Sequence, residues 1–407
     1  MFELIGQYTS AKVMADKIDS ATRSQIYAII SNPAFTNPIS IMQDCHKGAG
    51  AVIGFTMEMG DKVIPNIVGR DKGCGVLLFN VGRGILRDIS RKELDIIIRN
   101  RIPFGPKVHG GKGVFDIEDK FFWLNLNFDL VKFTTKFNSK YGTSYSYREM
   151  DYREFTIICK KINMDSERAI LSLGTLGSGN HFIEIDKSKN TKDYWASVHS
   201  GSRQFGSKVC MYWQRKAGKG ELAYLTEKDM FNYLCEMLIS QTYAEENRRL
   251  MKDIILNILD VEPTEIIESV HNYMDYSDWI IRKGAISSYK DQKVIIPLNM
   301  EDGSLICEGK SNPEWNYSAP HGAGRVDSRR WANENLSNKE AQKRMNDKDI
   351  YYSTLPTDET RDAYKDGQMI KDLLDPTATL IEHIKPVLVM KDGSKYGSKR
   401  DRKKFKK

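Results

Sequence analysis

Short apolar runs separated by turn-forming residues recur along most of this chain. Each run is rich in aliphatic or aromatic side chains and is bounded by Gly, Pro, Asn, Asp or Ser, a pattern typical of β-strands. The runs expected to form strands are Ile39–Met42, Ala51–Thr56, Val63–Val68, Val76–Val81, Phe182–Ile185, Trp195–His199, Val294–Leu298, Ser304–Glu308 and Pro386–Met390. We therefore expect sheets to form much of the core.

Three stretches have helical patterns instead. Residues 19–31 offer Asp19 or Ser20 as an N-cap, and Ser90–Arg101 places its apolar residues on one side of a helix. The longest pattern, Glu227–Leu259, exceeds the usual length of one uninterrupted helix.

Strands and helices alternate along the chain without a steady strand–helix–strand rhythm, and no internal repeat or linker divides it. This arrangement favours the α+β class: a single large domain with stacked, largely antiparallel sheets and surrounding helices. We expect that domain to span residues 1–390.

The charge of the chain is concentrated at one end. Residues 391–407 contain nine Lys/Arg and two Asp, a net charge of +7. The whole chain has 61 Lys/Arg and 54 Asp/Glu, so residues 1–390 retain 52 of each. A basic tail of this kind is expected to be flexible and to attract polyanions without sequence preference, although it could also serve only solubility.

No apolar run approaches the length of a membrane span, and the N-terminus lacks the pattern of a signal peptide. We therefore expect a cytoplasmic protein without a membrane partner. The six cysteines show no Cys-x-x-Cys pair and no spacing typical of small disulfide-rich domains, so reduced thiols are expected.

Candidate chemistry lies in short motifs of Gly, Ser and Asn that carry His, Cys or Asp. The motifs are QDCHKGAG (43–50), GRDKGCGV (69–76), GTLGSGNHFIE (174–184), SVHSGSR (197–203), VHNY (270–273) and PHGAGR (320–325). Together they offer carboxylates, a thiolate and several imidazoles on turns at strand ends, where ligands from distant segments can converge. Imidazoles with a thiolate suggest zinc, whereas an added carboxylate and a bound phosphate favour Mn²⁺. One thiolate can also bridge two ions.

The same motifs, with GKSNPEWNYSAPHGAGR, DAYKD and IKPVLVMK, resemble the RtcB family of RNA-splicing ligases from residue 40 to residue 391. The resemblance implies the RtcB-like fold and a GTP- and Mn²⁺-dependent RNA ligase with two metal ions. Such an enzyme joins RNA 3′-phosphate or 2′,3′-cyclic phosphate ends to 5′-hydroxyl ends in RNA splicing or repair.

The resemblance also implies roles for particular residues. His321 matches the guanylylated histidine, and Asp44 and Arg325 match further active-site groups. Glu184 and Lys391 match contacts to the guanine edge, and Tyr364 matches a stacking partner for the base. The matched metal ligands are Asp71, Cys74, His181, His199 and His271. The matched GTP-binding residues are Asn180, His181, Phe182, Ile183, Glu184, His271, Asn272, Pro297, Leu298, Asn299, Met300, Ser304, His321, Gly322, Ala323, Gly324, Tyr364 and Lys391.

Three departures from the family pattern are visible. The turn after SGSR is Gln204-Phe205-Gly206, which is bulkier than usual in the family. Asp327 stands where a methionine is usual after the HGAGR motif, and an added carboxylate there could weaken phosphate binding or pair with Arg329 or Arg330. The chain also continues past Lys391, and we expect the basic extension to bind RNA. An archease-like activator is a further possible partner. Two alternatives stay open: a guanylyltransferase that caps RNA or DNA 3′ ends, and a metal-dependent cyclic phosphodiesterase that does not seal.

Overall fold

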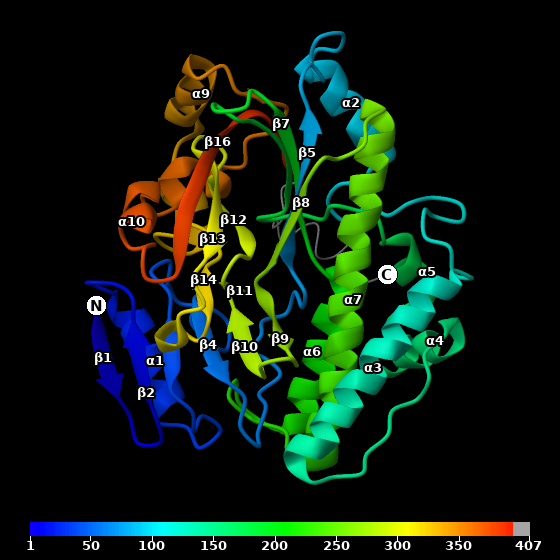
Figure 1. The fold of residues 1–407 in the computed structure, drawn as a ribbon, viewed down its shortest axis with the longest axis vertical. Coiled ribbons are helices and arrows are strands. Elements are labelled where there is room, and N and C mark those ends of the chain that lie inside the picture. The colour runs from blue at the N-terminus through cyan, green and yellow to red at the C-terminus, as the bar shows by residue number, and fades with distance from the viewer. Residues whose placement is uncertain (394–407) are drawn as a thin grey trace.

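Two large sheets, with helices on their outer sides, make up the computed structural model, which describes residues 1–393 (Figure 1). The first sheet has six strands in the order β1-β2-β3-β4-β10-β9, and only the β2–β3 pair is parallel. Its strands are β1 (Phe2–Ile5), β2 (Ser10–Val13), β3 (Ile39–Ile41), β4 (Phe55–Glu58), β9 (Asn272–Asp275) and β10 (Ile280–Lys283).

The second sheet has eight strands and nearly closes on itself. Its order is β12-β13-β16-β6-β7-β5-β8, and β15 pairs with β16. The strands are β5 (Gly75–Gly82), β6 (Phe182–Lys187), β7 (Tyr194–Ser200), β8 (Ile266–Val270), β12 (Lys293–Asn299), β13 (Gly303–Gly309), β15 (Tyr351–Tyr352) and β16 (Ala378–Met390). The N–H of Ile295 on β12 donates to Ser269 Oγ on β8 at 2.9 Å, which joins the two outer strands. A separate pair, β11 (Ala285–Ser287) with β14 (Ser318–Pro320), lies beside the sheets.

Ten α-helices surround these sheets within residues 1–393. They are α1 (Ser20–Ile30), α2 (Arg91–Arg101), α3 (Lys120–Tyr141), α4 (Tyr152–Lys161), α5 (Ser166–Leu171), α6 (Arg203–Ala217), α7 (Glu227–Leu259), α8 (Arg329–Asn335), α9 (Asn338–Asp347) and α10 (Gly367–Asp372). Three short 3₁₀ turns occupy Pro313–Trp315, Thr357–Glu359 and Arg361–Ala363. None of the helices in the described part of the chain combines the length and apolar character needed to cross a bilayer.

Helix α7 organises the molecule. It runs without interruption for 33 residues and packs on β5 and β7 on one side and on α3 and α6 on another (Figure 1). Its buried Arg248 donates from Nη1 to Gly73 O at 2.6 Å and to Ser200 O at 2.8 Å. Its neighbour Asn247 donates to Thr175 O and Gly201 O. These bonds fix the turns before β5 and after β7 in one place.

The α+β class and the largely antiparallel sheets predicted from the sequence are confirmed. The expected strand at Val63–Val68 is wrong: within it only Val63 forms an isolated bridge, to Leu225. Pro65 lacks the N–H that a ladder needs, and its carbonyl instead accepts from Lys72 and Tyr233. The expected strand at Ala51–Thr56 overlaps β4 only at its last two residues.

The domain limit at residue 390 stays a prediction. Of the predicted basic tail, residues 391–393 are described and residues 394–407 lie outside the described residues.

Candidate active site

The five residues predicted as metal ligands come together at the ends of four neighbouring strands. Asp71 and Cys74 lie on the turn that leads into β5, and His181 precedes β6, whereas His199 lies on β7 and His271 follows β8. Their ligand atoms form two groups, Asp71–Cys74–His181 and Cys74–His199–His271, each with all atoms within 4.8 Å of one another. Cys74 belongs to both groups, so its thiolate is placed to bridge two ions.

Hydrogen bonds on the outer side of the rings orient two of these histidines. His181 Nδ1 lies 2.8 Å from Leu176 O and His199 Nδ1 lies 3.1 Å from Asn180 O. A proton on each Nδ1 leaves the Nε2 lone pair facing the cluster, as in metal-ligating histidines generally.

The inner side of the cluster fits a cation. His199 Nε2 lies 3.4 Å from His271 Nε2 and 3.4 Å from Cys74 Sγ, so several electron-pair donors face one another. His181 Nε2 lies 2.9 Å from Asp71 Oδ2 although its Nδ1 already faces a carbonyl, and a neutral ring cannot donate to both. A metal ion between these atoms would remove both conflicts.

Burial keeps most of this cluster uncharged. Burial, with the neighbouring imidazoles, lowers the pKa of His199 and of His271 well below the ordinary value. Burial and the Asp71 carboxylate raise the pKa of the Cys74 thiol. Burial would raise the pKa of Asp71, but the hydrogen bond and charge of His181 outweigh it, so that pKa is lowered. The Asp71 carboxylate beside the neutral imidazoles of His199 and His271 is a donor set suited to a divalent ion.

A close approach to α7 explains the presence of Gly73 inside the GRDKGCGV motif. Gly73 has φ of +68°, and a Cβ at this position would lie 2.8 Å from Gln241 Cα on α7. Only glycine allows both the left-handed backbone and this contact. The motif therefore packs directly against the helix that also holds the neighbouring turns.

His321 lies immediately beyond β14, beside the metal-ligand cluster. Its ring centroid is 4.8 Å from that of His271. Its Nδ1 is 2.6 Å from Oδ2 of Asp44, a fully buried carboxylate. An Asp44 acceptor at this distance holds the proton on Nδ1 and leaves Nε2 unprotonated, which is the form of imidazole that can act as a nucleophile.

The glycines of the HGAG motif allow this pairing. Gly324 has φ of +73°, and a Cβ there would lie 2.1 Å from the carbonyl oxygen of Asp44. The motif thus presses against the backbone of Asp44, and the same contact brings the Asp44 carboxylate to His321.

A cavity of about 300 Å³ opens beside His321. Of the residues predicted to bind nucleotide, those that line it are Asn180, Phe182, Glu184, Pro297, Leu298, Asn299, Met300, His321, Gly322, Ala323, Gly324, Tyr364 and Lys391, together with Arg325 and the metal-ligand candidate His199. The others lie outside its wall. His181 and His271 belong to the metal cluster, Ile183 lies in the core, Asn272 donates to Asp71 O, and the Ser304 hydroxyl is buried on β13.

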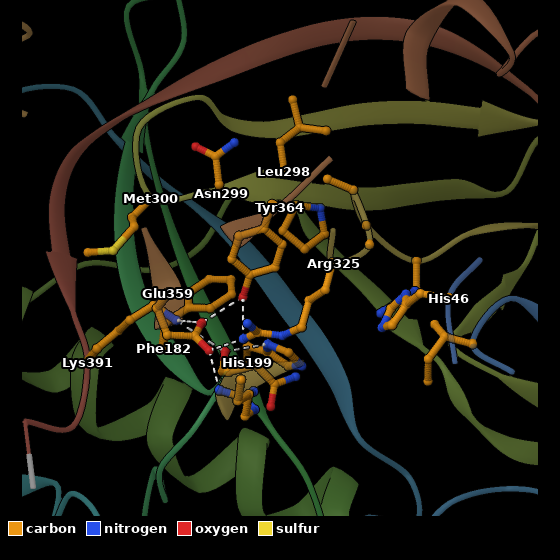
Figure 2. A pocket seen from close by; sticks show the side chains of 18 of the residues that line it. His46, Phe182, His199, Leu298, Asn299, Met300, Arg325, Glu359, Tyr364 and Lys391 are labelled. Atoms are coloured by element: carbon orange, nitrogen blue, oxygen red, sulfur yellow. Dashed lines mark hydrogen bonds and ion pairs between the residues drawn. The ribbon is translucent and has the colours of Figure 1, made fainter. Parts of the chain in front are cut away.

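Glu359 is the main cavity residue that the sequence did not single out. It is buried, it accepts from Tyr364 Oη at 2.7 Å and from Lys391 Nζ at 2.8 Å, and it pairs with Arg325 and Arg329 (Figure 2). Burial opposes its ionisation, but the surrounding cations, led by Lys391, hold its pKa well below the usual range. No local motif marked Glu359, because its role depends on charges from distant segments.

The Glu359 carboxylate holds both Arg325 and Tyr364. The Arg325 guanidinium lies over the Tyr364 ring at 4.8 Å and donates to Asp358 O at 2.6 Å. Arg325 is therefore anchored at the wall of the cavity.

The exposed Asp327 accepts from the Ser328 N–H, whereas Arg329 and Arg330 pair with Asp358 and Glu334, so neither expected ion pair of Asp327 forms.

Behind Glu184 lies a second buried carboxyl group. Glu184 and Asp186 are two residues apart on β6, so both side chains lie on one face of the sheet. Burial and the nearby Asp186 raise the pKa of Glu184, and burial raises the pKa of Asp186 to about 7. Neither Asp186 oxygen has a protein N–H or O–H donor within the described residues. Burial therefore favours the protonated forms of these two carboxyl groups.

His46, Lys47 and Gly48 form another part of the wall. His46 lies at the end away from Met300 and Lys391 (Figure 2). His46 Nδ1 lies 3.0 Å from Asp44 O, and burial lowers the pKa of His46 to about 4. These residues were not predicted as site residues. The glycine-rich, basic character of QDCHKGAG is the signal that could have indicated them.

A histidine with a free Nε2, a donor cluster for two ions and an adjoining polar cavity define a candidate metal-dependent catalytic site. The family model described as tRNA-splicing ligase RtcB matches residues 25–392. The chain belongs to the RtcB family.

Curated relatives agree with this assignment. The chain is similar to the RNA-splicing ligase RtcB of Escherichia coli K12, with 30% identity over 346 residues that cover 77% of this chain and 79% of the relative. It is also similar to the tRNA-splicing ligase RtcB of Nanoarchaeum equitans, with 26% identity and 94% of each chain covered. The RNA-splicing ligase RtcB of Mycobacterium tuberculosis is 24% identical, with 76% of this chain and 84% of the relative covered.

Proposed function

We propose that this protein is a GTP- and Mn²⁺-dependent RNA ligase that joins RNA 3′-phosphate or 2′,3′-cyclic phosphate ends to 5′-hydroxyl ends. The observation that carries the proposal is the pairing of His321 Nδ1 with Asp44 beside a cluster of five metal-ligand candidates. Membership of a family whose named members are RNA-splicing and tRNA-splicing ligases supports the RNA substrate.

In the first step, Nε2 of His321 attacks the α-phosphorus of GTP. The N–P bond forms as the bond from the α-phosphorus to the bridging oxygen breaks, and pyrophosphate leaves with that electron pair. Asp44 keeps the Nδ1 proton in place and stabilises the positive charge that the ring gains on attack. The geometry of this pair supports a nucleophilic rather than a purely structural histidine.

Asp71, Cys74, His181, His199 and His271 would hold two Mn²⁺ ions, with Cys74 shared between them. When bound, the ions supply positive charge that offsets the repulsion between phosphate oxygens and the attacking group. The inward Nε2 lone pairs and the buried Asp71 carboxylate support this assignment.

The cavity suits a guanine base. A carboxyl oxygen of Glu184 accepts from an N–H group of the guanine edge, and Lys391 donates to the guanine carbonyl oxygen. Tyr364 provides an aromatic face. Lys391 Nζ is held 2.8 Å from Glu359 and 3.4 Å from Asn180 O, so the group that would read the base is already positioned.

The sealing steps follow from the same arrangement. An RNA 3′-phosphate oxygen attacks the guanylyl phosphorus, a P–O bond forms, and the N–P bond to His321 breaks. The 5′-hydroxyl oxygen then attacks the 3′-phosphate, its proton is lost, and GMP leaves. A cyclic phosphate first takes up water to give the 3′-phosphate.

Labelling with GTP that carries ³²P at the α-phosphate tests the first step. We expect an acid-labile, alkali-stable protein adduct that requires Mn²⁺ and is lost in His321→Ala. The matched control is His383→Gln, on β16 outside the cavity wall, which should label normally. An adduct that persists in His321→Ala would exclude His321 as the nucleophile.

A second assay separates sealing from the alternative activities. RNA with a 3′-phosphate and a 5′-hydroxyl is incubated with GTP and Mn²⁺, with and without an archease-like activator. A joined product supports the ligase. A 3′-guanylylated but unjoined product would identify a capping enzyme, and opening of the cyclic phosphate alone would identify a phosphodiesterase.

A further inference from the structure

Positive charge gathers on the outer face of β16, where α10 lies beside that strand (Figure 1). Lys371 of α10 places its Nζ 3.0 Å from Nδ1 of His383, and Lys385 places its Nζ 3.0 Å from Nε2 of the same ring. Ile384, between the two strand residues, is buried inside the sheet, so His383 and Lys385 face the other way. Two lysines from separate elements therefore converge on one histidine outside the sheet.

Two more cations meet at Asp302, in the turn between β12 and β13. Lys348 Nζ lies 3.2 Å from Asp302 Oδ1, and Arg361 Nε lies 3.2 Å from Oδ2. The backbone oxygen of Asp302 lies 2.6 Å from His383 Nε2 and accepts from Lys385 Nζ at 3.1 Å. The four cationic residues that surround Asp302 and His383 are called here the basic cluster: Lys348, Arg361, Lys371 and Lys385.

The basic cluster holds more positive charge than the nearby carboxylates neutralise. The Asp302 carboxylate is shared by two of its members. The neighbouring Glu301 is already bound through two nitrogens of Arg344, at 2.8 Å and 2.9 Å. Within residues 1–393, neither Lys371 nor Lys385 forms an ion pair with a carboxylate.

The histidine does not relieve this excess of charge. Burial and the Lys385 ammonium lower the pKa of His383 to about 4, so the ring is neutral. Its Nε2–H donates to Asp302 O, so Nε2 cannot also accept from Lys385. Burial, with the charges of Lys371 and Lys348, lowers the pKa of Lys385 to about 8 although Asp302 opposes this shift. A bound anion would reduce the repulsion among these cations.

We propose that the basic cluster binds phosphate groups of the RNA backbone, outside the cavity that takes the reacting end. The inference rests on the proposed function, because RNA is the substrate in that function. Lysine ammonium groups bind phosphate as point charges, and an arginine guanidinium offers several donors in one plane. None of the four side chains is buried, and those of Lys348 and Arg361 are 40% and 44% exposed.

The location of the basic cluster favours an RNA strand over a free anion. Asn299, Met300 and Gly303 line the cavity, and Asn299 Nδ2 donates to Asp302 Oδ2 at 2.9 Å within the same turn. The cavity and the basic cluster thus lie on the two sides of one short turn. A strand that leaves the cavity over this turn meets the cluster, and its successive phosphates can engage cations from several elements.

Fluorescence anisotropy of a labelled single-stranded RNA, over a salt series without GTP, tests the proposal. We expect Lys371→Gln/Lys385→Gln to weaken binding by about three- to tenfold. The slope of log affinity against log salt concentration should become shallower by about 1.4, because each phosphate contact contributes about 0.7 in a single strand.

The matched control removes the same charge from another part of the surface. Lys120→Gln/Lys160→Gln alters exposed residues of α3 and α4, which lie across the molecule from α10 (Figure 1). This variant should leave the affinity and the slope nearly unchanged. Equal effects in the two double variants would indicate only general attraction to a positive protein and would overturn the proposal.

Labelling with GTP alone separates failure of the RNA site from failure of the proposed function. Both double variants should form the His321 adduct at the wild-type rate, because the described residues that line the cavity include none of those replaced. Loss of labelling together with RNA affinity would indicate a structural role and overturn the proposal. If the wild-type chain forms no adduct but binds RNA through the basic cluster, the proposed function fails and the phosphate site stands.

Two further probes identify the source of the anion. The ³¹P NMR signal of inorganic phosphate would reveal a free-phosphate site if it broadened with the wild-type chain but not with Lys371→Gln/Lys385→Gln, while RNA affinity stayed equal in both. Binding of poly-glutamate that only this variant loses, again with equal RNA affinity, would identify an acidic protein partner. Either result would overturn the assignment to RNA.

Discussion

The short contact between Asp44 and His321 controls which nitrogen of the imidazole is free. Replacing the carboxylate with an amide keeps the size of the side chain but removes the charge that stabilises the ring as it becomes positive. We expect Asp44→Asn to slow guanylylation of His321 by about 10²- to 10⁴-fold while GTP binding changes little. Single-turnover labelling and equilibrium nucleotide binding measure the two quantities separately. Equal loss of both would indicate a structural role for Asp44.

The buried Glu184–Asp186 pair makes stability depend on pH. Burial raises the pKa of Asp186 from 3.8 to about 7, so the folded state binds a proton that the unfolded state has already released. This contribution to stability is present below about pH 4, falls as the pH rises, and is lost above about pH 7.

Asp186→Asn should therefore flatten the fall in the free energy of unfolding between pH 4 and pH 7, by up to about 1.4 kcal/mol per pH unit. Denaturant unfolding followed by tryptophan fluorescence measures the slope. Asp88→Asn, at an exposed position, is the control. An unchanged slope in Asp186→Asn would show that the folded state does not raise the pKa of Asp186.

Among the elements, the HGAG turn is the one whose backbone positions the reacting group. In Gly324→Ala the new Cβ would meet the Asp44 carbonyl, so the turn must shift and separate His321 from Asp44. We expect labelling to fall by more than about tenfold, with a loss of roughly 1–3 kcal/mol in stability.

Gly142→Ala provides a matched control for this prediction. Gly142 ends α3 with φ of +63°, but a Cβ there would meet nothing within 4 Å. The two substitutions share the same kind of backbone strain, and only Gly324→Ala adds the clash with Asp44. If both variants label normally, the turn does not position His321.

Helices and strands with one buried face could be predicted from the sequence, whereas those whose apolar residues follow another pattern could not. Helix α2 has a capping box formed by Ser90 and Glu93 and a single apolar side, so its pattern was clear. Helix α3 was missed because apolar residues on two sides remove the usual 3.6-residue periodicity. Only the last part of the 13-residue β16 was predicted, because charged and polar side chains interrupt the apolar residues in its first half. Several strands of two to four residues were too short to give a pattern.

The candidate site was predictable to the extent that its chemistry lies in local motifs. The metal-ligand cluster and His321 lie in Gly-rich turns, where an isolated His or Cys is conspicuous. Glu359 and Asp186 could not be found this way, because their importance arises from residues brought close by the fold.

At the scale of the whole molecule, we expect the basic extension to be a separate source of affinity for RNA. Residues 394–407 contain eight Lys/Arg and one Asp. Deleting them should weaken RNA binding and make its dependence on salt concentration shallower, because fewer counterions are released. Fluorescence anisotropy with a labelled RNA over a salt series measures both effects, and guanylylation with GTP alone is the control that should not change. An unchanged salt dependence would support the solubility interpretation of the tail.

The candidate site also has a consequence for protein synthesis. Its parts span the chain from Asp44 to Lys391, with the nucleophile candidate at position 321. During translation, the metal-ligand candidates leave the ribosome well before His321, and Lys391 leaves after both. A ribosome-bound chain that lacks this final segment has neither the complete cavity nor its Glu359–Lys391 ion pair. Under the proposed function, we therefore expect the nucleotide site to be completed after the metal-ligand cluster, so that GTP turnover would begin only when synthesis is almost finished.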